Sequence, residues 1–396
     1  MSYSYQLSKP LATYGRELRD WSASEVRPFA RQADTDHKPP ANWAKVLDTS
    51  PVPLGRTDLA EPDPVPTFEE GSWVSSLVFY ENINYGDIWV HPTLGGGIGH
   101  LVVESMGTDE QIEKWYKPVV ERGLPTGFAL TEPHFGSDTS QVSTTAVRDG
   151  DSWILNGSKI FCTGGATSDY VVVFATTDKS LGAKGISAFV VPAGTPGFVI
   201  VKENEEKLGI RSWVTSQLLF DNCVIPVENQ LGWNAAGDST PRRSGQGGAL
   251  GALSNNRPNM AAMAIGLGQA SIDVTTSILA GQKTGFTPQR WASIERDLEA
   301  MNFALERGRR VCFRGQSLVD SGNEDRAVSA AGKGYPPETV ERVIRRCMQL
   351  LGPEGTSQEL LLEKWYRDVK IMDIFEGSGQ VQRIVVGRTL MGRLVG

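Results

Sequence analysis

Residues 170–201 read YVVVFATTDKSLGAKGISAFVVPAGTPGFVIV, and this segment indicates the fold class of the whole chain. Its three apolar runs, Tyr170–Phe174, Ile186–Val191 and Phe198–Val201, are rich in β-branched and aromatic residues and are separated by Gly, Pro and Asp. Such runs are typical of short strands. Because no helical period separates them, a parallel doubly wound sheet is disfavoured, and an antiparallel barrel or sandwich is expected.

Helical patterns flank this β-rich segment. Leu11, Tyr14, Leu18 and Trp21 recur at three- and four-residue spacing, which places one apolar stripe on a helix face. Residues 340–351 and 360–374 are also helical in pattern, with a turn at 352–355 between them. We therefore expect an α+β multidomain chain with an N-terminal helical domain at 1–125, an antiparallel β-domain at 126–232, a glycine-rich linker at 233–254 and a C-terminal helical bundle at 255–396.

The composition favours a folded protein that does not bind nucleic acid. Of the 396 residues, 40% are hydrophobic and 21% are charged, which provides apolar material for a core without the charge bias of a disordered chain. The net charge of −7 argues against neutralisation of phosphates. The opening MSYSYQLSKP has no positively charged region followed by an apolar run, and no stretch approaches a membrane span of about 20 apolar residues. We expect a cytoplasmic protein.

Metal and nicotinamide chemistry have no support in the motifs. The four cysteines show no CxxC pair and the four histidines no HExxH spacing, so no metal site is predicted. Glycine clusters at 95–99 and 266–268 invite a dinucleotide interpretation. A Rossmann fingerprint must follow a strand and open a helix, whereas both clusters lie in regions predicted to be helical.

Two segments carry residues suited to a planar heterocycle. The segment FALTEPHFGSD at 128–138 combines the donors Thr131 and Ser137 with Gly136, which allows close approach of a ligand. The segment NGSKIFCTGG at 156–165 places Phe161 and Thr163 beside paired glycines. Taken alone, the first segment is better explained as a Pro- and Gly-rich loop with a capping Asp, and the alternative for the second is a hairpin turn with a core Phe.

Two C-terminal segments complete a recognisable pattern. They are QLLGPEG at 349–355 and RDVKIMDIFEGSGQVQR at 367–383. With the two earlier segments, in this order and spacing, they resemble the acyl-CoA dehydrogenase family, whose chains carry a TEP-x-x-GSD loop, a strand-turn flavin segment, an Arg-Asp pair and an acidic-Gly-Thr/Ser turn. The resemblance extends from about Arg16 to Gly392.

The resemblance implies FAD-dependent α,β-dehydrogenation of an acyl-CoA thioester in fatty acid β-oxidation. Glu376 matches the base that removes the α-proton, flavin N5 accepts the β-hydride, and electron-transfer flavoprotein is the implied electron acceptor. A carboxylate suits this task when an apolar pocket raises its pKa and hydrogen bonds hold the developing enolate. The alternative for Glu376 is a solvated side chain at a helix start.

The resemblance also implies the binding residues. FAD contacts are implied at Phe128, Leu130, Thr131, Gly136, Ser137, Phe161, Thr163, Gln349, Gly352, Gly355, Ser378 and Gln380, and substrate contacts at Ser137, Arg257 and Gly377. The family usually has Trp where Phe161 stands, and an aromatic ring is retained. The turn at 349–355 resembles one that reaches the flavin of a neighbouring subunit.

One family feature is missing. Relatives carry an arginine that meets the FAD pyrophosphate across a subunit boundary, and Gln282 stands in its place. Lys283 is a point charge without the bidentate fork of arginine. We therefore predict that this chain does not complete its neighbour's FAD site. The assembly is either a homo-oligomer (dimer or tetramer) or an α2β2 hetero-oligomer with a related chain.

Several readings of the function stay open beside the main one. They are a non-catalytic scaffold chain, a subunit acting on steroid or other bulky acyl groups, a flavin oxidase and a dehydrogenase of carrier-protein thioesters. Gly95, Gly96 and Gly97 fall where the family shapes its acyl pocket, which favours a wide pocket. Glu376 argues against the scaffold, because a scaffold has no need of a base.

Overall fold

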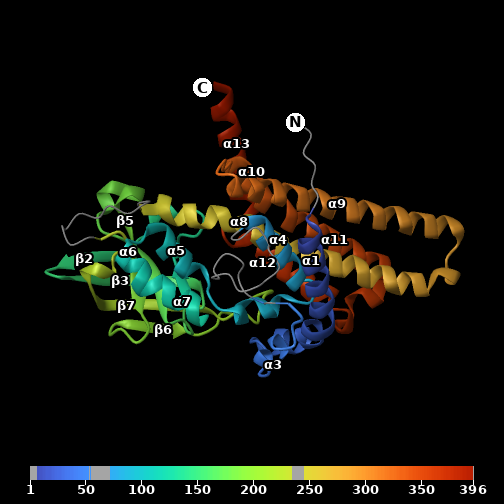
Figure 1. Cartoon of the computed structure of the whole chain (residues 1–396), viewed down its shortest axis with the longest axis horizontal. Helices are drawn as coiled ribbons and strands as arrows, with labels where there is room; N and C mark the ends of the chain where they lie inside the picture. The colour runs from blue at the N-terminus through green and yellow to red at the C-terminus, as the bar shows by residue number, and fades with distance from the viewer. Residues whose placement is uncertain (1–6, 53, 55–71, 234–244, 396) are drawn as a thin grey trace. The chain divides into compact units, whose positions relative to one another are not determined.

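The computed structural model describes residues 7–52, 54, 72–233 and 245–395, and the chain divides into two compact units (Figure 1). The first, the helical unit, comprises Met1–Thr93, Lys207–Ser212 and Ser254–Gly396. The second, the β unit, comprises Leu94–Glu206 and Trp213–Leu253. Helices from both ends of the chain therefore build one unit.

The helical unit begins with an amphipathic helix that the sequence predicts well. The Ser8 hydroxyl accepts a hydrogen bond from the Leu11 N–H, which caps the start of α1, and Leu11, Tyr14, Leu18 and Trp21 are all buried. In chain order the unit contains α1 (Lys9–Trp21), η1 (Ser22–Val26), η2 (Arg27–Phe29), α2 (Ala30–Asp36), α3 (Trp43–Leu47), α4 (Trp73–Ile83), most of α8 (Gly245–Gly281), η8 (Lys283–Gly285), α9 (Pro288–Asp320), α10 (Arg326–Gly334), α11 (Pro336–Leu351), η9 (Gly352–Thr356), η10 (Gln358–Leu360), α12 (Leu362–Ile374) and α13 (Gly379–Val395).

Helix α8 lies in the core of the helical unit. A Cβ at Gly266 would lie 2.1 Å from the Glu81 carbonyl oxygen of α4, so only glycine allows this approach. The segment Ser254–Gly281 is long and apolar enough to cross a membrane, a span that the composition did not predict. Of that apolar window, 67% is buried inside the protein, which is typical of a core helix that is apolar all round.

The β unit contains a seven-stranded sheet and a group of short helices. Its elements are η3 (Ile88–Leu94) at the boundary, α5 (Ile98–Met106), α6 (Asp109–Gln111), η4 (Ile112–Tyr116), α7 (Lys117–Arg122), β1 (Thr126–Ala129), η5 (Thr139–Gln141), β2 (Thr145–Asp149), β3 (Ser152–Thr163), β4 (Tyr170–Thr176), η6 (Lys179–Gly185), β5 (Ile186–Pro192), β6 (Phe198–Lys202), β7 (Thr215–Pro226) and η7 (Val227–Asn229). The strand order is β1-β4-β2-β3-β7-β6, with β5 also paired to β4.

The three strands expected from the apolar runs are present as β4, β5 and β6, and most pairs are antiparallel as expected. The exceptions are the parallel pairs that β4 makes with β1 and, at one position, with β2. Every residue of β4 is buried, because Val172 packs into a cluster with α5 and α7 while Val171 packs into a second cluster with β3, β5 and β7. Burial of both faces explains its unbroken apolar run.

The structure differs from the sequence-based prediction in the glycine-rich stretch. Residues 234–244 of the predicted linker at 233–254 lie outside the described residues, whereas α8 already begins at Gly245. Ala249, Leu250 and Ala252 are strong helix formers and offset the glycines between them.

Candidate functional site

In the β unit, β1 leads directly into the first predicted flavin segment. The parallel pairing with β4 fixes its register, with Phe128 opposite Val172, and the half-buried Phe128 ring lies 5.4 Å from that of Phe174 between centroids. Leu130 is buried at the end of the strand. Beyond it the chain turns outward, so that Thr131 is half-buried and Gly136 and Ser137 are exposed.

A buried ion pair anchors this loop. The Lys159 ammonium lies 2.8 Å from Glu132 Oε1, and both side chains are almost fully buried. Glu132 also accepts hydrogen bonds from the backbone and hydroxyl groups of Ser143 and Thr144. Burial alone would raise the pKa of Glu132, but the Lys159 charge and these hydrogen bonds lower that pKa to about 2. Since Lys159 also donates to the Leu130 carbonyl, the pair joins the loop to β3.

The second predicted flavin segment lies against the first. The Ile160 N–H donates to the Thr131 carbonyl at 3.0 Å, which places Phe161 next to the loop. The β3–β7 register shifts between Lys159 and Cys162, and within this irregularity Phe161 has a φ of 57°. Its side chain is 59% exposed, so the alternative interpretation of Phe161 as a core residue is wrong. A left-handed backbone at a bulky residue costs about 1–2 kcal/mol, and such strain concentrates at functional positions.

These residues fit a planar heterocycle. Phe161 presents an exposed ring, and hydroxyl donors at Thr131, Ser137 and Thr163 lie on the same two segments, with Ser137 and Thr163 exposed to solvent. The Phe161 ring is exposed although its backbone is strained, and an exposed aromatic ring can stack on a planar ligand. The structure therefore brings the loop and the end of β3 together, and their contact with an isoalloxazine ring stays a prediction.

In the helical unit, the predicted base occupies a tight turn between α12 and α13. Glu376 has a φ of 55° and Gly377 a φ of 92°, so two consecutive residues are left-handed. The Glu376 carbonyl accepts hydrogen bonds from Arg257 Nε at 3.0 Å and from Gln382 Nε2 at 3.4 Å. Gln382 also donates to the Gly377 carbonyl at 3.2 Å. Several donors therefore fix a strained turn.

The Glu376 carboxylate has its own neighbours on α8 and α10. Asn256 Nδ2 donates to Glu376 Oε1 at 3.1 Å. Lys333, with no exposed surface, interacts electrostatically with Glu376 and donates to the Gly377 carbonyl at 3.5 Å. Asn256, Lys333 and Gln382 were not predicted from the sequence. No local pattern marks Lys333, because the turn that its ammonium contacts lies far away in the sequence.

Arg257 supports the base directly. It is 6% exposed, and besides the Glu376 carbonyl it binds the Ser254 hydroxyl through Nη1 at 3.2 Å. Burial lowers the pKa of Arg257, while the charge of Glu376 raises it. Substrate contact by Arg257 and Gly377 stays a prediction.

Ser378 and Gln380 lie at the start of α13. The Ser378 hydroxyl accepts a hydrogen bond from the Val381 N–H at 3.4 Å, so Ser378 caps the helix, and Gln380 is exposed in the first turn. A helix N-terminus favours anionic groups, which agrees with the phosphate-bearing cofactor expected here.

The third predicted group lies where α11 ends. Gln349 and Gly352 are exposed, whereas Gly355 is buried so tightly that a Cβ would lie 2.4 Å from the Met348 carbonyl oxygen. Gln282 Nε2 donates to Glu354 Oε2 of this turn at 3.4 Å. The position of the family's arginine is therefore next to the turn, and a carboxylate is present there.

Lys283 contacts an aromatic ring in this region. Its ammonium lies 4.8 Å from the centroid of the Trp291 ring. A cation held over an indole face is stabilised in that position, which disfavours the role of Lys283 as a replacement for the missing arginine.

The glycine clusters have packing roles. In the first cluster, Gly95, Gly96 and Gly97 have left-handed backbone between η3 and α5, whereas Ile98 and Gly99 begin α5, so the helical prediction holds only for the end of the cluster. A Cβ at Gly97 would lie 2.3 Å from the Thr126 carbonyl oxygen, and Gly96 pairs with Pro125. These glycines bring the chain against β1, and they give no support for a wide acyl pocket.

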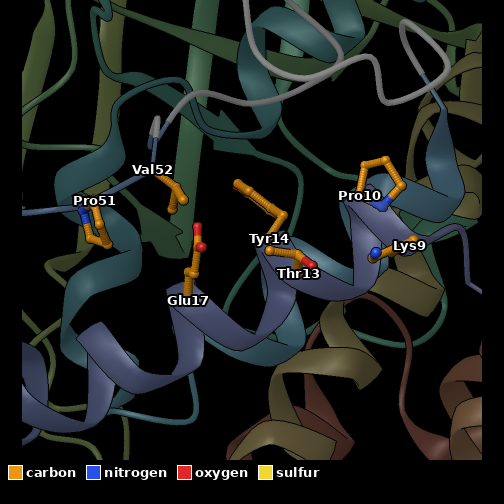
Figure 2. Close-up of a pocket in the computed structure, with 7 residues that line it drawn as sticks. All are labelled: Lys9, Pro10, Thr13, Tyr14, Glu17, Pro51 and Val52. Carbon is orange, nitrogen blue, oxygen red and sulfur yellow. The ribbon is translucent and has the colours of Figure 1, made fainter.

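Two hollows of the helical unit contain none of the predicted site residues. The first, of about 440 Å³, is lined by Lys9, Pro10, Thr13, Tyr14 and Glu17 of α1 and by Pro51 and Val52 (Figure 2). The second, of about 400 Å³, is lined by Arg31, Asp34, Thr35, Arg211, Thr356, Gln358, Glu363 and Arg367. Ion pairs of Arg31 and Arg367 with Asp34 and Glu363 occupy the polar groups of the second hollow.

Comparison with known proteins places the chain among flavoenzymes of one family. The acyl-CoA dehydrogenase middle domain matches residues 127–223, and the acyl-CoA dehydrogenase C-terminal domain matches residues 243–391. The mitochondrial short-chain specific acyl-CoA dehydrogenase of Rattus norvegicus is 33% identical over 94% of this chain and 88% of its own. The cyclohex-1-ene-1-carbonyl-CoA dehydrogenase of Geobacter metallireducens is 35% identical over 74% of this chain and 76% of its own.

Solved structures support the same fold. Butyryl-CoA dehydrogenase from Megasphaera elsdenii superposes with a TM-score of 0.86 at 27% identity, and the match covers 98% of this chain and 100% of that one. The expected fold class is thereby confirmed.

Proposed function

Since the chain belongs to the acyl-CoA dehydrogenase family, we propose that it oxidises an acyl-CoA thioester between its α and β carbons, with Glu376 as the base. The observation that supports this most strongly is the Glu376–Gly377 turn. Both residues of this turn have left-handed backbone, and Arg257 and Gln382 bind their carbonyls. The turn therefore orients a half-buried carboxylate. A solvated glutamate at a helix start would need no such strained backbone.

The proton transfer follows from this geometry. The α-proton of a thioester is a weak acid, so the Glu376 carboxylate must be charged, aligned and protected from competing water when it accepts that proton. Asn256 fixes one carboxylate oxygen, and the turn fixes the backbone. We assign the Glu376 N–H to the thioester carbonyl, where negative charge develops.

The cofactor is FAD, which when bound accepts the hydride that leaves the β-carbon. The exposed Phe161 ring would stack on the isoalloxazine, and hydroxyls of Thr131, Ser137 and Thr163 would donate to its polar edge. The capped N-terminus of α13, with Ser378 and Gln380, would contact the adenine end.

The acyl group is of one of two classes. Relatives named for short-chain and butyryl substrates favour a short linear chain. The relative named for a cyclohexene carboxylate favours a ring-bearing one. We propose CoA as the thioester carrier and electron-transfer flavoprotein as the acceptor, in keeping with the family.

The test is anaerobic bleaching of the flavin by a panel of CoA thioesters, with linear and cyclic acyl groups and a carrier-protein thioester. Glu376→Gln should retain bound FAD and lose bleaching by about 10²–10⁴-fold, because the amide keeps the shape and removes the base. Glu359→Gln is the control, since Glu359 is an exposed glutamate of the same unit. Bleaching of the Glu376 variant within a few-fold of the unaltered enzyme would require another base.

A second proposal concerns assembly. We infer an α2β2 hetero-oligomer in which a related chain supplies the arginine that binds the FAD pyrophosphate. In this chain Gln282 stands at the position of that arginine and donates to the Glu354 carboxylate. Exposed Ile384, Leu390 and Met391 on α13 favour association of some kind.

The competing arrangement is a homo-oligomer, which is the general default. Flavin per subunit and mass should be measured for the chain expressed alone and with a related chain encoded beside it. Full flavin occupancy in the chain alone would exclude the heteromer as a requirement.

A further inference from the structure

Lys333 is a buried lysine that the reaction described above does not use. It lies on α10 with no exposed surface, and burial is the main reason that its pKa falls to about 8. Burying an ammonium is costly unless charges or hydrogen bonds compensate for lost water. Its position therefore requires a reason in its surroundings.

The packing around Lys333 is tight on two sides. A Cβ at Gly332 would lie 3.4 Å from Pro258 of α8, and a Cβ at Gly334 would lie 3.0 Å from Gln382 of α13. The two glycines therefore let α10 approach both helices that hold the base turn. The Lys333 side chain reaches the base turn, where its ammonium contacts the Gly377 carbonyl.

Four charged side chains, three from helices and Glu376 from the turn itself, meet around the base turn. Lys333 of α10 is attracted by Glu376 and by Asp373 of α12, and it is repelled by Arg257 of α8. Arg326, at the start of α10, also acts on Arg257. Within Arg257, Lys333, Asp373 and Glu376 the charges balance, and Lys333 shares its charge between two carboxylates.

Lys333 also contacts the turn itself. Its ammonium donates to the Gly377 carbonyl at 3.5 Å and lies 5.7 Å from the centroid of the Phe375 ring. It thus touches the residues on both sides of Glu376. With Arg257 and Gln382 it completes the set of donors to the two carbonyls of the left-handed pair.

We propose that Lys333 is a positioning residue for the base, holding the Glu376–Gly377 turn through the Gly377 carbonyl and favouring the charged form of Glu376. This inference rests on the proposed role of Glu376. Lys333 and Glu376 attract each other, so loss of Lys333 removes a charge that favours the carboxylate and makes Glu376 easier to protonate. Asp373 has the opposite influence, because it competes for the same ammonium.

The test is the pH dependence of the single-turnover rate of flavin bleaching. Lys333→Met should move the acid limb of this profile upward by about one pH unit or more, which lowers the rate below the limb about tenfold. Lys333→Arg should keep the acid limb at the pH of the unaltered enzyme, since it keeps the positive charge. Asp373→Asn should move the limb to lower pH. The opposite signs separate an electrostatic role from a loss of stability.

Lys364→Met is the matched control. Lys364 is a fully buried lysine of the same unit, but it pairs with Asp87 and Asp368. Its loss should lower the unfolding temperature at least as much as Lys333→Met does, because two buried carboxylates lose their counter-charge, and it should leave the acid limb in place. Should Lys333→Met and Lys364→Met have the same limb as the unaltered enzyme, the inference is wrong.

A measurement without turnover separates this inference from the proposed function. Hydrogen exchange at residues 375–378 should be faster in Lys333→Met than in Lys364→Met, because only Lys333 binds the turn. Equal exchange in the two variants would show that Lys333 does not hold the turn, whatever the substrate proves to be. If no thioester bleaches the unaltered enzyme, the proposed function is wrong. The exchange result still decides whether Lys333 holds the turn.

Discussion

Replacing Glu132 by Gln should destabilise the β unit by about 3–4 kcal/mol at pH 7. A pKa lowered from 4.5 to about 2 in the folded state corresponds to about 3.4 kcal/mol, at about 1.4 kcal/mol per unit. Removal of one partner of a buried ion pair typically costs about 3–5 kcal/mol, which agrees. The variant leaves the Lys159 ammonium buried without its counter-charge.

The same pair gives a defined pH dependence. Because the folded pKa of Glu132 lies below the unfolded one, its stabilisation is complete well above pH 4.5 and is lost as the pH falls toward 2. The wild-type advantage over Glu132→Gln should shrink by about 1 kcal/mol at pH 4 and by about 2 kcal/mol at pH 3. Urea unfolding of both apoproteins, followed by circular dichroism, measures this difference.

Asp178→Asn is the control for this experiment. Asp178 is an exposed turn carboxylate of the β unit that hydrogen-bonds Ser180, and its loss should leave the denaturation midpoint unchanged. A Glu132→Gln destabilisation below about 1 kcal/mol, or a difference that does not shrink in acid, would refute the reasoning about the ion pair. The variant should also bind FAD more weakly, since Lys159 and Glu132 join the loop to β3.

Three further substitutions test backbone geometry. Phe161→Asn should leave the unfolding temperature of the apoprotein equal or higher, because Asn tolerates the left-handed backbone. Its affinity for FAD should fall about tenfold, because the stacking ring is lost. A lower unfolding temperature with unchanged FAD affinity would contradict this prediction. Gly266→Ala should destabilise the helical unit by about 2–3 kcal/mol, because the new Cβ would meet the Glu81 carbonyl. Gly281→Ala has open space around it and should stabilise the unit by about 0.5–1 kcal/mol. Equal unfolding temperatures of the two variants would refute the packing argument.

The periodic parts of the fold were predictable because burial leaves a regular pattern in the sequence. The apolar stripe of α1 and the unbroken apolar run of β4 report burial of one face and of two faces respectively. The parallel pairing of β1 with β4 was not predictable, because strand direction depends on the path of the chain through the β2–β3 hairpin.

The candidate site was predictable where it consists of contiguous motifs. Thr131 and Phe161 belong to such motifs, and the structure joins them through the Ile160–Thr131 hydrogen bond. Lys333 was missed because its partners lie 40 or more positions away and no local pattern requires a lysine there. The left-handed backbone at Phe161 and Glu376 was also invisible, since neither residue type favours it.

The division of the helical unit between the two ends of the chain has a consequence for biosynthesis. Arg19 of α1 pairs with Asp273, 254 positions later, and Arg309 pairs with Glu81, 228 positions earlier. At about 5–20 residues per second, α1 and α4 emerge from the ribosome tens of seconds before these partners exist. α1 and α4 can pack against each other, but their surfaces that contact α8 and α9 stay uncovered while the β unit is made. The hazard for the newborn protein is therefore aggregation during translation, and it is set by the order of synthesis and not by the stability of the finished fold.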